Sequence, residues 1–146
     1  MTKDSLRIVL ESITTKVSDQ DEDSLEIIGK DFPLRTLVTV TDFYIQLGTI
    51  IQATGQGFRP GSKSRFYPFL NSLNASTNLT KLTAETDSAD EDSSWLLMAR
   101  AMIVSGSEST EYDSESFSNI LTLWHQDIAN LIATEGPYTI TAMLES

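Results

Sequence analysis

The sequence predicts a mainly α-helical protein, a single domain of residues 1–146 folded as a bundle of four to five helices. Apolar residues recur at spacings of three and four over much of the chain. With 146 residues, 40% hydrophobic and 21% charged, the chain has the composition of one folded domain with one core. It has no cysteine, which excludes a disulfide framework and thiolate metal sites.

The first predicted helix runs from about Ser5 to Val17. Its apolar residues share one helical face, and they are Leu6, Val9, Leu10, Ile13 and Val17. Asp4 is the predicted N-cap, because its carboxylate can accept a backbone N–H at the start of a helix. A short helical turn is predicted over residues 24–28 and ends near Gly29.

A longer helix is predicted from Pro33 to Ala53, since proline is favoured in a first helical turn. Its apolar stripe consists of Leu34, Leu37, Val40, Tyr44, Leu47 and Ile51. The β-branched residues within 36–41 argue for a strand. A helix is preferred because apolar and polar residues alternate poorly over residues 37–43. Residues 54–64, rich in glycine, are the predicted loop.

The second half contains a short predicted helix at residues 68–73 and a polar, acidic segment at 74–94 that is predicted to be mobile. A further helix begins near residue 88 or 90 and ends near Ile103. The last helix begins near residue 113 or 114 and ends before Gly136. The tail at residues 138–144 is predicted to be a short strand or a docked extension.

Charge is distributed unevenly along the chain. Residues 1–81 contain nine Lys or Arg and nine Asp or Glu, whereas residues 82–146 contain Arg100 and twelve Asp or Glu. The net charge of −11 therefore belongs to the second part. No signal-peptide core and no run of 18 apolar residues occurs, so we expect a cytoplasmic protein with no membrane contact.

The sequence does not predict an enzyme. Residues 57–64 resemble a phosphate-binding loop, but the glycine spacing is wrong and Pro60 removes a backbone donor. His125 is the only histidine, and a boundary residue satisfied by a carbonyl or water is favoured over a general base or pH switch. The acidic clusters lack the spacing of a calcium loop. No catalytic residue, metal or cofactor is predicted.

One cluster of basic and aromatic residues is a candidate site for nucleic acid. Cations neutralise phosphates, and aromatic rings stack on exposed bases. The predicted contacts are Arg59, Lys63, Arg65, Phe66 and Tyr67. The alternative is a surface loop whose aromatic side chains fill the core beneath it.

The first functional hypothesis is a structural subunit of a larger nucleoprotein assembly. A neutral half and an acidic half suit heterologous stacking of copies, or contact with other protein subunits. In size and layout the predicted bundle resembles the small helical subunits of RNA-guided CRISPR complexes and of helical nucleocapsids. That resemblance implies an RNA-binding role in which the basic-aromatic loop contacts single-stranded nucleic acid.

The alternative hypothesis is an acidic protein that mimics nucleic acid and occupies a basic surface of a partner. Rows of carboxylates would form its binding surface. The predicted contacts are Asp90, Glu91, Asp92, Glu111, Asp113 and Glu115.

Overall fold

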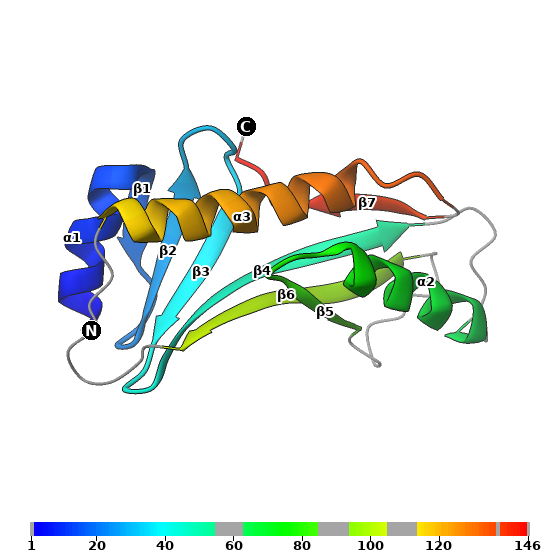
Figure 1. The fold of residues 1–146 in the computed structure, drawn as a ribbon, viewed down its shortest axis with the longest axis horizontal. Coiled ribbons are helices and arrows are strands. Elements are labelled where there is room, and N and C mark those ends of the chain that lie inside the picture. Colours follow the sequence, from blue (N-terminus) through cyan, green and yellow to red (C-terminus); the bar gives the residue numbers. More distant parts are fainter. Residues whose placement is uncertain (1, 55–62, 85–93, 105–113, 137, 146) are drawn as a thin grey trace.

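The structure, a computed structural model, is built on one antiparallel β-sheet. It describes residues 2–54, 63–84, 94–104, 114–136 and 138–145. These residues form seven strands and three helices (Figure 1). The prediction of a mainly α helical bundle is therefore wrong.

The sheet has the strand order β1-β2-β3-β4-β6-β5, and its neighbouring strands are antiparallel. β7 pairs with the last residues of β4, beyond the part of β4 that pairs with β3. The elements are α1 (Lys3–Ile13), β1 (Thr14–Asp19), β2 (Ser24–Gly29), β3 (Arg35–Val40), β4 (Tyr44–Thr54), α2 (Lys63–Ser76), β5 (Lys81–Ala84), β6 (Ser94–Val104), α3 (Ser114–Ile132) and β7 (Thr139–Ala142).

Three segments that were predicted to be helical are strands. Residues 24–28 lie in β2, residues 33–53 contain β3 and most of β4, and the described residues up to Ile103 lie in β6. In β3, β4 and β6 the physical reason is burial with a period of two, which is the period of a strand. β2 is instead buried at five of its six positions, so its sequence shows no such alternation. In β6 the core-facing residues are Leu97, Ala99, Ala101 and Ile103.

The helical predictions at the two ends of the chain are confirmed in part. α1 begins two residues earlier than predicted and ends at Ile13, and its N-cap is Thr2 instead of Asp4. Thr2 and Ser5 form a capping box, in which each side chain accepts from the other's backbone N–H. α3 follows the prediction closely, and β7 lies within the predicted C-terminal strand.

α2 includes the short helix predicted at residues 68–73, with Pro68 inside it. β5 lies in the segment 74–94 that was predicted to be mobile. Residues 85–93 of that segment lie outside the described residues. No helix in the described part of the chain is long and apolar enough to cross a membrane.

The helices and the core lie on one side of the sheet. α3 runs along the sheet, α1 lies near β1 and β2, and α2 lies near β5 and β6 (Figure 1). Their apolar side chains form one cluster with the buried strand residues. Trp124 of α3 is fully buried, and its Nε1 donates to Oγ1 of Thr36 in β3 at 3.0 Å. One face of the sheet therefore supplies the core.

Asp127, a buried carboxylate on α3, holds the turn between α2 and β5. The backbone N–H groups of Asn78, Leu79 and Thr80 donate to its two oxygens at 2.8–3.0 Å. Burial alone would raise the pKa of Asp127, but these donors outweigh burial and hold the pKa below its ordinary value of 3.8. The charged carboxylate is thus a structural part of this turn.

We predict that Asp127→Ala lowers the free energy of unfolding by about 2–4 kcal/mol, because three backbone N–H groups, that of Thr80 buried, lose a charged acceptor. The difference from the wild type should shrink as the pH falls below 3.8 and through the lower folded pKa, where the carboxylate becomes protonated. Urea unfolding of both proteins at several pH values measures this. Glu135→Ala, which removes an exposed carboxylate, is the matched control. Equal stability of the two variants would contradict the prediction.

Candidate functional site

The predicted nucleic-acid contacts fall in and before α2. Arg59 lies outside the described residues, and Lys63 and Arg65 lie in the first turn of α2. Phe66 is fully buried and packs edge to face on Tyr138, with ring centroids 5.2 Å apart. Tyr67 is 38% exposed. The structure therefore places Phe66 in the core and Tyr67 at the surface.

The predicted acidic contacts are mostly outside the described part of the chain. Glu115 is exposed in the first turn of α3, where a carboxylate suits the helix dipole. The others, which lie outside the described residues, are Asp90, Glu91, Asp92, Glu111 and Asp113.

A surface that the sequence analysis missed lies on the side of the sheet opposite the helices. Directly opposed residues of antiparallel strands share a face. The pairings therefore place one row of side chains across this uncovered face, in the order Glu26, Leu37, Gly48, Arg100 and Lys81. Gly48 is at the centre of that row. The missing side chain leaves the middle of the face open.

Gly48 forms the floor of a hollow of about 370 Å³. A Cβ atom at this position would meet only the carbonyl oxygen of Ala99, at an ordinary contact distance of 3.8 Å. Packing within the chain therefore does not require glycine here. A glycine inside a strand often marks a place where another molecule approaches closely. We call this depression the Gly48 hollow.

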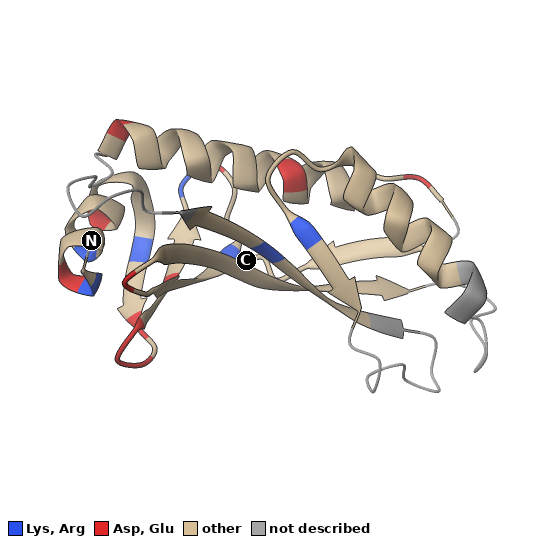
Figure 2. Cartoon of the chain, turned by 60° about the horizontal axis from the view of Figure 1, so that its bottom comes forward, with Lys and Arg blue, Asp and Glu red and all other residues tan. Residues whose placement is uncertain are grey.

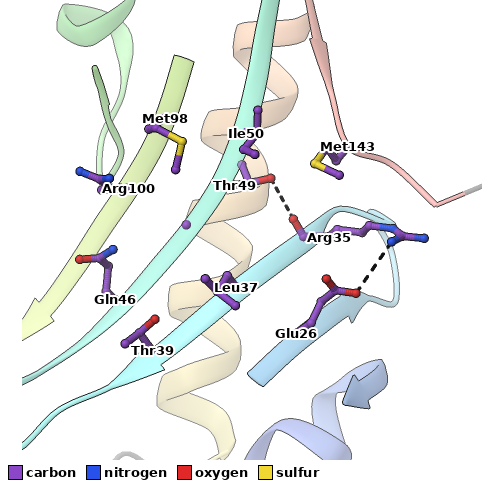
Figure 3. A pocket seen from close by; sticks show the side chains of 11 residues that line it. Glu26, Arg35, Leu37, Thr39, Gln46, Thr49, Ile50, Met98, Arg100 and Met143 are labelled. Atoms are coloured by element: carbon purple, nitrogen blue, oxygen red, sulfur yellow. Dashed lines mark hydrogen bonds and ion pairs between the residues drawn. The ribbon is translucent and has the colours of Figure 1, made fainter. Parts of the chain in front are cut away.

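Apolar surface predominates in the Gly48 hollow, where four aliphatic or sulfur-containing side chains lie among six polar or charged ones (Figure 3). The polar and charged side chains are Glu26, Arg35, Thr39, Gln46, Thr49 and Arg100. Leu37 is 43% exposed, Ile50 37% and Met143 46%, and Met98 is half-buried beside them. Met102, 56% exposed, lies on the same face of β6. Three of the four methionines of the chain are thus on the uncovered face. Methionine is flexible and polarisable, and is typical of surfaces that adapt to varied apolar partners.

Arginines stand beside the Gly48 hollow. Arg35 lies 3.9 Å from Glu26, at the outer limit of an ion pair, and both are partly exposed. Arg100 is exposed, and its guanidinium group has no ion pair or hydrogen bond to another described residue. Lys81 is opposite Arg100, but its ammonium group donates to the carbonyl of Asn74 at 3.3 Å. Among these three cations, Arg100 is therefore the one whose charged group has no ion pair or hydrogen bond within the described part of the chain.

The cationic residues that the structure describes are divided between strands, helices and turns. Lys16, Arg35, Lys81 and Arg100 lie on strands, and the others lie on α1, on α2 and in the turn after β2. Most carboxylates lie in turns and near helix ends (Figure 2). In the described ranges, no group of three or more His, Asp or Glu side chains is arranged to hold a metal ion. The uncovered face thus combines apolar surface with positive charge, on a chain whose net charge is −11.

The sequence contained two signals for this face. Met98, Arg100 and Met102 alternate with small and apolar residues, as expected of a strand with two different faces. Gly48 interrupts the apolar pattern of residues 45–53. Both were hidden because the same residues also fit a helical spacing.

Comparison with known proteins identifies the fold. No protein-family model and no curated protein matches the chain. The crystal structure of YbjN from E. coli is similar, with a TM-score of 0.58 and 16% sequence identity. The alignment covers 87% of this chain and 85% of that chain. The two chains share a fold. At this identity the similarity shows the fold alone.

His125 lies in a second, polar pocket, between α3 and the turn after β2. Its ring contacts Phe32 edge to face at 5.8 Å. A Cβ at Gly29 would lie 2.5 Å from Cε1 of His125 and from the carbonyl oxygen of Phe32, so the ring requires glycine there. Nε2 is buried and has no hydrogen-bond partner among the described residues. Burial lowers the pKa of His125, and the nearby Asp31 opposes this only in part.

We predict that His125 makes the protein less stable in mild acid. Its folded pKa lies below the ordinary value of 6.5, so the unfolded chain binds the proton first. The contribution of neutral His125 to the free energy of unfolding is complete above pH 6.5, and it is lost as the pH falls toward the pKa of His125 in the folded protein. Urea unfolding between pH 8 and 5 should show this decline in the wild type. The decline should be smaller in His125→Leu, and an identical pH dependence would contradict the prediction.

Proposed function

We propose that the chain is a non-enzymatic protein-interaction domain, and that its uncovered sheet face binds a partner protein. The observation that carries this proposal is the Gly48 hollow, an apolar depression on a sheet face that no described element covers. Soluble proteins rarely expose contiguous apolar surface without a use for it, and such patches mark interaction sites.

The polar groups of the described residues support binding rather than catalysis. The buried carboxylate of Asp127 is occupied by three backbone donors. His125 faces a pocket whose only other titratable side chains are Lys30 and Asp31. The Gly48 hollow has one carboxylate on its wall, Glu26, and that group lies beside Arg35. None of these arrangements pairs an activated nucleophile with a base.

The lining also favours protein over nucleic acid as the partner. Stacking on bases requires aromatic rings, and the described residues that line the Gly48 hollow include none. The nucleoprotein-subunit hypothesis and the nucleic-acid-mimic hypothesis remain proposals, and both also require a protein partner. YbjN is described as "a putative transcription regulator", and an interaction face of this kind would suit a regulatory protein.

Site-specific photo-crosslinking in the native host tests the proposal. A photo-reactive benzoylphenylalanine replaces Leu37 on the uncovered face in one variant. In the matched control it replaces Ile8, which is 71% exposed on α1. We expect the Leu37 position alone to form a discrete protein adduct that survives nuclease treatment. No protein adduct at Leu37, adducts with nucleic acid only, or the same adducts at both positions would contradict the proposal.

A further inference from the structure

We propose that the partner segment is acidic, with an apolar anchor side chain that enters the Gly48 hollow and carboxylates that contact Arg100 and Arg35. This inference rests on the proposed function and names the chemistry of the partner. It follows from the shape of the hollow, the kind of residues that line it and the charge at its edge.

The apolar anchor of the partner is inferred from the residues at the centre of the uncovered face. Gly48 has no side chain; Leu37 lies opposite it on β3 and Ile50 two residues further along β4, each more than one third exposed. A large apolar side chain buried beside them would lose contact with water, which favours binding. Met98 and Met143 on the walls can change rotamer to fit anchors of different shape. The hollow therefore selects an apolar residue without demanding one particular shape.

The acidic character of the partner segment is inferred from the guanidinium groups of Arg100 and Arg35. Arg100 has no ion pair in the described part of the chain, and its fork of donors matches a carboxylate. Arg35 meets Glu26 at only 3.9 Å and retains further N–H donors for a second acid. Among the charged residues on the wall of the hollow, two are cations and one is an anion.

The negative charge of the chain does not exclude an acidic partner. Repulsion from the net charge of −11 acts at long range, and physiological salt screens it beyond about 8 Å. The contacts with Arg100 and Arg35 are local. A nucleic acid would meet the same cations, but the described residues that line the Gly48 hollow include no ring on which a base could stack, so an acidic protein segment fits the hollow better.

Methyl NMR of the full-length chain tests the inference, because the reporters are already in place. Met98, Met102 and Met143 report on the uncovered face, and the methyl signals of Ile8, which is 71% exposed on α1, are the internal reference. Three peptides of equal length serve as probes. The first alternates leucine and glutamate, the second replaces each glutamate with lysine, and the third replaces each leucine with serine.

We expect the leucine–glutamate peptide to shift the signals of Met98, Met102 and Met143 but not those of Ile8. The lysine peptide should bind at least about tenfold more weakly, and the serine peptide should not bind. Arg100→Glu should reverse the preference between acidic and basic peptides. Lys30→Glu, the same charge change at a residue that lines the pocket beside His125, should leave the preference unchanged.

Equal binding of the acidic and basic peptides, or an unchanged preference in Arg100→Glu, would overturn the inference. So would the absence of any shift at the three methionines. If the Leu37 photo-crosslink to a protein persists in that case, the proposed function stands and the acidic-partner inference alone fails. If the crosslink is also absent, both fail.

Discussion

The rest of the structure depends on one constraint: α3 is fixed to one face of a sheet whose side chains alternate strictly between two faces. Trp124 fixes it, because its ring is fully buried and its Nε1 bonds the hydroxyl of Thr36 in β3. Asp127, three residues along the same helix, holds the turn that leads into β5. The helix thereby connects the middle of the sheet, at β3, with the turn that precedes the edge strand β5. Every second strand residue then faces away from the core.

The residues that face away determine what the molecule can do. A sheet that only needed solubility on this side would carry polar residues there, as antiparallel sheets with one wet face commonly do. Here Leu37, Ile50 and the methionines are exposed around a glycine whose Cβ position is sterically free. Gly48 also weakens its strand, since glycine in a strand interior costs about 0.5–1 kcal/mol relative to alanine. A binding role explains why such a surface is kept.

The two terminal helices could be predicted from the sequence, and the sheet could not. In α1 and α3 most apolar residues fall on one helical face, and their spacing does not fit the alternation of a strand. In β3 and β4 both faces carry apolar residues, so Leu37 was assigned to the same helical stripe as Val40, although the two lie on opposite faces of the sheet. The pairing of β4 with β6 joins residues about 50 positions apart, such as Gly48 and Arg100, and no local pattern reveals it. The candidate site was missed for the same reason, since it exists only once those strands are side by side.

The most direct test of the account is Gly48→Val, measured for both stability and partner binding. We predict that the variant folds and is more stable than the wild type by about 1 kcal/mol, because valine suits a strand and a Cβ at this position meets no closer contact than 3.8 Å. We also predict that the variant no longer forms the partner adduct at Leu37, because the added side chain fills the hollow. A strongly destabilised Gly48→Val would show that packing requires the glycine. A stable variant that binds its partner as the wild type does would show that the hollow is not the binding site.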